Sequence, residues 1–92
     1  LANPKRIEII NLLSDGEQSV GGLLIKTGLL KANLSQHLSV MRTKGIVKTR
    51  KHGLTVFYRI ANPKIVKACN LMREVLFEQV KEKGEEMKKW RR

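Results

Sequence analysis

The sequence predicts a mostly α fold with a small β-hairpin, whose elements follow one another in the order α-α-α-β-β-α. Two Asn-Pro pairs, at residues 3–4 and 62–63, each precede a segment whose apolar residues recur at helical spacing. Between them lie two runs rich in β-branched and aromatic residues, separated by a short turn that contains glycine. Ninety-two residues allow a single domain with a modest core.

The first two helices are predicted from their end signals. Asn3 is a favoured N-cap, and Pro4 loses no hydrogen bond at the first helical position, so a helix begins here and ends at residues 14–16, Ser-Asp-Gly. Ser19 can cap a second, short helix, and Gly28 can end it in the left-handed conformation. A tight turn then leads into a third helix.

The third helix, predicted over residues 31–43, carries Leu34, Leu38 and Met41 on one stripe. Its opposite face is short, polar and uncharged, whereas a solvated helix face usually carries pairs of Glu and Lys. Small hydrogen-bonding side chains allow close approach to base edges in a DNA major groove. The residues predicted to contact DNA from this helix are Lys31, Ala32, Asn33, Ser35, Gln36, Ser39 and Arg42.

Individual roles follow from side-chain chemistry. Gln36 can pair with an adenine edge, Lys31 with a guanine or a phosphate, and the serines with either. His37, at the border of the apolar stripe, is expected to be packed or hydrogen-bonded within the protein. The alternative is that this face is only solvated.

The hairpin is predicted from strands at 46–51 and 54–60, with His52-Gly53 as the turn. The second strand has apolar residues on both faces, so its core face is not assigned. A basic ribbon of this kind beside a helix-turn-helix is a wing, and the whole pattern predicts a winged helix-turn-helix. Wing 47–60 is expected to contact the DNA backbone or minor groove through Lys48, Arg50, Lys51, His52 and Arg59. Alanine at Arg50 or Lys51 should then weaken binding to all DNA sequences alike.

The charge distribution favours a polyanion as partner. The formal net charge is +11, and no acidic residue lies between Glu17 and Glu74, an interval that contains many Lys and Arg residues. A basic protein without such a partner would carry its acids scattered along the chain. We therefore expect this interval to form a phosphate-binding surface.

The last helix has a broader apolar stripe than one small domain needs to cover. We expect it to form a homodimer interface, which would present two recognition helices to a palindromic operator on double-stranded DNA. Residues 1–62 are accordingly interpreted as the DNA-binding part, and 63–92 as the dimerisation helix and a basic tail of the same domain. The predicted interface residues are Ile65, Cys69, Met72, Val75, Leu76 and Val80.

Other functional classes receive no support from the sequence. The apolar runs are too short to span a membrane, no signal peptide is visible, and one cysteine forms no internal disulfide, so a cytoplasmic protein without membrane contact is expected. Catalysis would need a carboxylate pair, an activated nucleophile or a phosphate loop, none of which is recognisable. We expect no cofactor and no metal site. Cys69 is interpreted as a small buried apolar residue, with an intersubunit disulfide as the alternative.

The chain resembles the ArsR/SmtB-type winged-helix transcriptional repressors. The resemblance is carried by three segments in family order, "LANPKRIEIINLL", "LLIKTGLLKANLSQHLSVMRTKGIV" and "KTRKHGLTVFYRIANP". It implies a homodimer that binds operator DNA, usually represses, and releases the DNA when an effector binds; the sequence does not identify the effector. An alternative is a winged-helix module that binds RNA or a protein partner on the same scaffold.

This chain departs from the family pattern at two places. Leu30 stands where the family commonly has a Ser cap, so the recognition helix must begin without that cap or be shifted by one residue. Residues 19–21, Ser-Val-Gly, replace the Cys-x-Cys of metal-sensing members, and the last helix lacks the Asp and His ligands of the other common metal site. The resemblance therefore does not extend to metal sensing.

Overall fold

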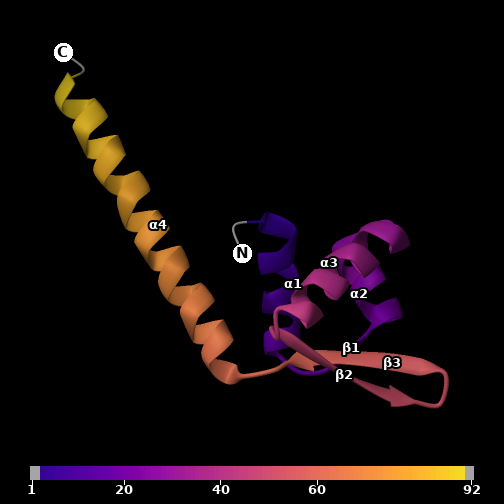
Figure 1. Cartoon of the computed structure of the whole chain (residues 1–92). Helices are drawn as coiled ribbons and strands as arrows, with labels where there is room; N and C mark the ends of the chain where they lie inside the picture. Colours follow the sequence, from indigo (N-terminus) through magenta and orange to yellow (C-terminus); the bar gives the residue numbers. More distant parts are fainter. Residues whose placement is uncertain (1–2, 91–92) are drawn as a thin grey trace.

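The computed structural model describes residues 3–90, with side chains as far as residue 86. The helices of the body surround a small core, the hairpin extends from one side, and the last helix leaves the body at an angle (Figure 1). This arrangement confirms the predicted order of helices and hairpin. The elements are α1 (Pro4–Ser14), β1 (Gln18–Ser19), α2 (Val20–Thr27), α3 (Lys31–Thr43), β2 (Val47–His52), β3 (Thr55–Ile60) and α4 (Pro63–Trp90).

Strand β1 is an addition to the predicted elements. The sheet is antiparallel with the order β1-β3-β2, and β1 contributes only two residues, which pair with Tyr58 and Phe57 of β3. Two residues give no local strand signal. The pairing places the segment between α1 and α2 against the hairpin, so β1 joins the wing to the helical body.

The hairpin turn lies one residue later than predicted. His52 pairs with Thr55, so the turn residues are Gly53 and Leu54 and not His52 and Gly53. Gly53 has φ +60° and Leu54 does not have a positive φ, which is the pattern of a type II′ turn with glycine at its first position. The requirement for glycine at that position fixes the register and puts Leu54 at the tip.

The core is built by the predicted apolar stripes. Leu34, Leu38 and Met41 of α3 are fully buried against α1 and α2, which confirms the predicted inner face of α3. Tyr58 and Ile60 also pack against this core, so the face of β3 that they share is the inner one. The buried residues are Ile9, Ile10, Leu13, Leu23, Leu34, Leu38, Met41 and Val47.

The turn between α2 and α3 sets the direction of α3. Gly28 ends α2 with φ +67°, the left-handed conformation predicted for it. The buried Thr27 hydroxyl donates to the Leu23 carbonyl (2.7 Å) and accepts from the Leu29 amide (3.3 Å). Helix α3 then begins at Lys31, as predicted, with Leu30 as an N-cap that forms no side-chain hydrogen bond. Thr27 thus stabilises the turn that the missing cap leaves without support.

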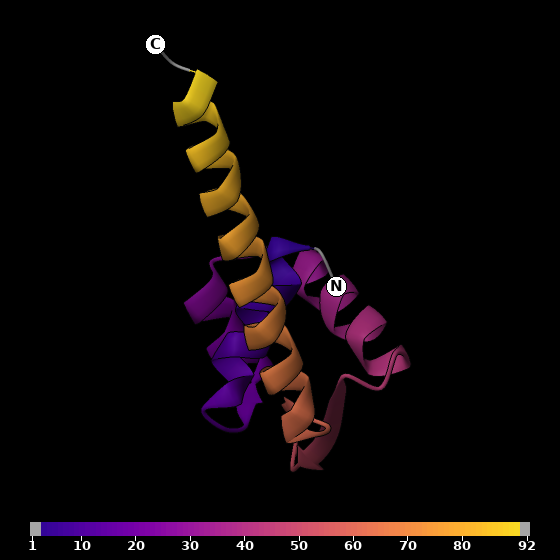
Figure 2. The same ribbon diagram turned by 90° about the vertical axis from the view of Figure 1, so that its left-hand side faces the viewer.

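Helix α4 has 28 residues, of which the first turns contact the body. Ile65, Val66 and Cys69 pack against the core, beside α1, and the rest of the helix extends away from it (Figures 1 and 2). The longest dimension of the molecule is consequently 64 Å. Among residues 3–90, no helix has the length and apolar character to cross a membrane.

Candidate nucleic-acid interface

The outer face of α3 is available to a ligand over its whole length. All seven predicted residues on this helix are exposed, including Lys31 at its start and Arg42 in its last turn. Neither of these two cations takes part in an ion pair with a described residue. His37 instead lies half-buried, and its Nδ1 accepts a hydrogen bond from Arg6 Nε of α1 (3.2 Å). As expected, His37 is satisfied within the protein, and it links α3 to α1.

The predicted wing residues divide between the two faces of the hairpin. Residues directly opposite each other on paired strands share a face, and Lys48 is opposite Arg59. Arg50 and His52 alternate with Lys48 along β2, so these four residues share the outer face. Lys51 is opposite Val56 on the other face, which is turned toward the helices. Sequence spacing alone placed all five residues together, and the structure separates Lys51 from the rest.

Arg50 is held by an acidic residue that the sequence did not single out. Its Nε donates to both carboxylate oxygens of Glu17 (2.9 and 2.8 Å) and Nη2 donates to Oε1 (2.7 Å). The guanidinium also lies over the Phe57 ring, 4.8 Å from its centre. Thirty-three residues separate Glu17 from Arg50, and the pair forms because β1 brings the segment before α2 to the hairpin.

The ion pair is evident in the ionisation of both groups. The hydrogen bond from Arg50 lowers the pKa of Glu17, with smaller contributions from the charges of Arg50 and Arg59. The same hydrogen bond raises the pKa of Arg50. Both groups therefore remain charged across the physiological range, and the positive charge of Arg50 is compensated by a carboxylate from the segment before α2.

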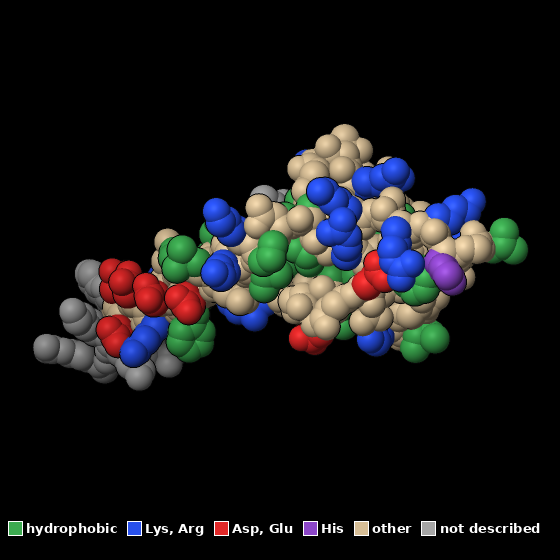
Figure 3. Space-filling view, turned by 90° about the horizontal axis from the view of Figure 1, so that it is seen from below, with side chains coloured by type: hydrophobic (Ala, Val, Ile, Leu, Met, Phe, Trp, Pro, Cys, Tyr) green, Lys and Arg blue, Asp and Glu red, His purple; other side chains and the backbone are tan. Residues whose placement is uncertain are grey.

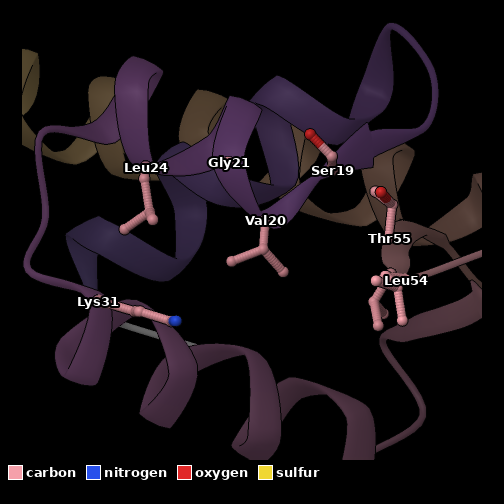
Figure 4. A pocket seen from close by; sticks show the side chains of 8 residues that line it. Ser19, Val20, Gly21, Leu24, Lys31, Leu54 and Thr55 are labelled. Atoms are coloured by element: carbon pink, nitrogen blue, oxygen red, sulfur yellow. The ribbon is translucent and has the colours of Figure 1, made fainter.

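A cleft of about 560 Å³ lies between the helix-turn-helix and the wing turn. Val20, Leu24 and Lys31 line it from the helices, and Leu54 and Thr55 line it from the hairpin. In Figure 4, Leu24 and Lys31 lie on one side of this space, and Leu54 and Thr55 lie on the other. The start of α3 and the tip of the wing therefore face the same hollow. No motif in the sequence indicated this cleft, because its walls come from three separate segments.

A second, apolar groove of about 460 Å³ runs between α1, Ile46 and α4. Four of the residues predicted for a dimer interface line this groove, namely Ile65, Cys69, Met72 and Leu76, and the first two also pack against the protein's own core. The predicted residues after Cys69 are exposed along α4; their exposed fractions are 59% for Met72, 43% for Val75, 51% for Leu76 and 69% for Val80. This stripe offers a continuous apolar surface outside the core.

Charge is distributed unevenly over the molecule. On the face shown in Figure 3, acidic side chains gather toward the end of α4, and Lys and Arg side chains dominate the body. The predicted basic tail lies outside the residues whose side chains are described. Within the described part of the chain, no group of three or more His, Cys, Asp or Glu side chains is placed to hold a metal ion.

Comparison with known proteins gives consistent results. A family model for the bacterial regulatory proteins of the arsR family matches residues 3–49. The HTH-type transcriptional regulator Rv0081 of Mycobacterium tuberculosis is 44% identical over 77 residues, which are 83% of this chain and 68% of that protein. The crystal structure of M. tuberculosis Rv0081 has a TM-score of 0.82 at 40% identity, covering 89% of this chain and 83% of that one.

Two further relatives carry more informative names. The biofilm growth-associated repressor of Xylella fastidiosa is 35% identical over 82 residues, which are 89% of this chain and 72% of that protein. A homodimeric winged helix-turn-helix DNA-binding domain from Mycobacterium bovis has a TM-score of 0.76 at 30% identity, covering 88% of this chain and 75% of that one. The matches include the helix-turn-helix whose geometry is described above. This chain therefore belongs to the arsR family of bacterial regulatory proteins, and it is a winged helix-turn-helix transcriptional regulator, not an enzyme.

Proposed function

We propose that this chain is a homodimeric, sequence-specific DNA-binding repressor that acts in the cytoplasm. In this proposal α3 reads the major groove and the β2–β3 wing contacts the neighbouring backbone or minor groove. The observation that carries the proposal is the exposed, small and polar face of α3, a helix whose first residue, Lys31, lines the same cleft as the wing turn. The repressor assignment is supported by the name of the Xylella fastidiosa relative.

Specificity is assigned to the middle of α3. The Gln36 amide can donate to and accept from one adenine edge, and Ser35 and Ser39 can bond to several bases. All three side chains are exposed on the face opposite the buried stripe. Lys31 and Arg42 stand at the two ends of the helix, where they can neutralise phosphates of the two strands that border a groove.

The homodimer is proposed from the surface of α4. A helix that exposes Met72, Leu76 and Val80 in water leaves a large apolar area uncovered, which single domains avoid. In a dimer with a twofold axis, the same stripe of a second copy would lie against this one and cover it. The homodimeric domain from M. bovis supports this arrangement. Residues 1–62 then bind DNA, and the helix that follows pairs the two copies on a palindromic operator.

Selection of bound duplexes from a random pool tests the proposal. We expect a roughly palindromic consensus and binding that weakens steeply with salt, because phosphate contacts release counterions. Gln36→Ala should relax the preference at one base pair, whereas Lys51→Ala should weaken all duplexes by a similar factor. Equal affinity for every duplex would overturn sequence-specific binding. A preference for structured RNA or a protein partner would favour the alternative of a winged-helix interaction module.

A further inference from the structure

Leu54 is an apolar side chain with no role in the fold. It is 98% exposed and lies at the tip of the hairpin, as the second of the two turn residues. The turn needs glycine at its first position, which Gly53 supplies, and it does not require an apolar residue at its second position. Single exposed apolar residues are common on protein surfaces, so exposure alone is not informative. The position of Leu54 relative to α3 is the informative feature.

The tip of the wing and the start of α3 border one cleft. Leu54 and Lys31 line it from opposite sides, and its volume is about 560 Å³ (Figure 4). A duplex that receives α3 in its major groove has one strand's backbone along the edge of that groove, and the minor groove lies beyond this backbone. If this backbone lies in the cleft between Lys31 and Leu54, the minor groove lies next to Leu54.

The charges around the cleft fit a phosphate backbone. Lys31 lies on its helical side, and Lys51 shares the wing face of Val56, which also lines the cleft. Both lysines are exposed, and neither takes part in an ion pair with a described residue. Arg50, by contrast, is on the outer face and is neutralised by Glu17. Two exposed lysines outside these ion pairs therefore flank the apolar tip.

We propose that Leu54 enters the minor groove next to the major-groove site and reads it by apolar contact. A guanine there presents an N2 amino group, which A·T pairs lack. A leucine side chain would cover that amino group without offering an acceptor, and burying an unpaired donor is costly. Leu54 is thus a residue that selects A·T pairs at the position the wing reaches, a role that rests on the proposed function.

The test uses the selected operator with three versions of the base pairs beside the α3 site: A·T, G·C and inosine·C. Inosine lacks the N2 amino group but otherwise resembles guanine, so it isolates the minor groove. We expect the wild-type protein to prefer A·T over G·C by about tenfold, and inosine·C to restore most of the affinity. Fluorescence anisotropy at several salt concentrations gives each dissociation constant.

Leu54→Ala should bind the A·T operator about tenfold more weakly, since alanine is too short to reach into the groove. It should discriminate little between A·T and G·C, and its salt dependence should match that of the wild type because no phosphate contact changes. Ile25→Ala is the matched control: Ile25 is 85% exposed on α2 and does not line the cleft. Its affinity and discrimination should be those of the wild type.

The outcomes separate this inference from the proposed function. If the wild type selects an operator but Leu54→Ala keeps its affinity and its preference for A·T, the role of Leu54 is wrong and the proposed function stands. Inosine·C behaving like G·C would also exclude the N2 amino group as the feature that is read. If the wild type selects no duplex, both proposals fail together. Thermal unfolding of Leu54→Ala should match the wild type, since this side chain packs against nothing.

Discussion

Arg50 and Lys51 are adjacent basic residues in β2 whose side chains have different electrostatic surroundings. Arg50 donates a bifurcated hydrogen bond from Nε and a second hydrogen bond from Nη2 to Glu17, and it lies over the Phe57 ring, whereas Lys51 points from the opposite face of the hairpin. An exposed ion pair of this kind adds little to stability, but it cancels a positive charge that would otherwise face solvent. The two residues should therefore differ in their contribution to DNA binding.

Substitution of each residue by glutamine measures this difference. Lys51→Gln should reduce the slope of log K against log salt by about 0.9 for each phosphate that the lysine neutralises. Arg50→Gln should change the slope less, because Glu17 already neutralises that guanidinium. Anisotropy titrations from low to physiological salt provide both slopes. Equal reductions of the slope by the two substitutions would mean that DNA displaces Glu17 from Arg50. The expectation from the sequence, that both residues contribute alike, would then hold.

Glu17 gives the wing a pH dependence of known sign. The hydrogen bond from Arg50 lowers the pKa of Glu17, so the pair stabilises the folded state above the unfolded pKa of about 4.3 and this stabilisation disappears as pH falls through the folded value. The difference in unfolding free energy between wild type and Glu17→Gln should therefore shrink below about pH 4. Urea unfolding at pH 7 and pH 3 measures it, and a difference that is equal at both pH values would contradict the role of the ion pair.

At the scale of elements, two glycines with open surroundings should respond in opposite ways to alanine. Gly28 ends α2 at φ +67°, where a Cβ costs about 1–2 kcal/mol through backbone conformation alone, since no atom lies within 4 Å of it. Gly84 lies inside α4 with equally open space, and alanine there should stabilise the helix by about 1 kcal/mol.

Thermal unfolding followed by circular dichroism distinguishes the two effects. Gly28→Ala should lower the midpoint temperature of unfolding. Gly84→Ala should raise the helical signal of α4 and should not lower the midpoint temperature. Because neither Cβ comes within 4 Å of a residue beyond its chain neighbours and its own helix, a clash with a distant part of the protein is excluded for both variants. A neutral Gly28→Ala would show that the α2–α3 turn tolerates another backbone conformation.

The elements that could be predicted from the sequence are those with local signals. The range of α3 follows from the spacing of Leu34, Leu38 and Met41, and Gly28 and Gly45 mark helix ends. Strand β1 could not be predicted, because its two residues are a strand only through pairing with β3, which lies about forty residues further along the chain. A separation of 33 residues likewise made the Glu17–Arg50 pair impossible to predict from local signals. The shifted turn was missed because glycine fits either position of a two-residue hairpin turn.

At the scale of the whole molecule, the helical body and α4 present different surfaces. The body buries its apolar residues around α3, whereas α4 exposes Met72, Leu76 and Phe77 to solvent. The groove between α1 and α4 continues this apolar surface up to the core. A second copy that covers the groove would contact α1, which is linked to the recognition helix by the Arg6–His37 hydrogen bond. In the proposed dimer, the interface would therefore be linked to α3 through α1 and this hydrogen bond.

Leu76→Glu tests the dimer most directly. Leu76 lines the groove and is 51% exposed, so a carboxylate is tolerated in a monomer but is buried without a partner in a dimer. That burial costs about 3 kcal/mol or more, which raises the dimer dissociation constant by roughly two orders of magnitude.

Leu71→Glu is the control, because Leu71 is also on α4, is 62% exposed and does not line the groove. Light scattering should report a monomer for Leu76→Glu and a dimer for Leu71→Glu at micromolar concentration. The monomer should retain binding to a half-site and lose most of its preference for the full palindrome, whereas a Leu76→Glu protein that remains dimeric would place the interface elsewhere on the molecule.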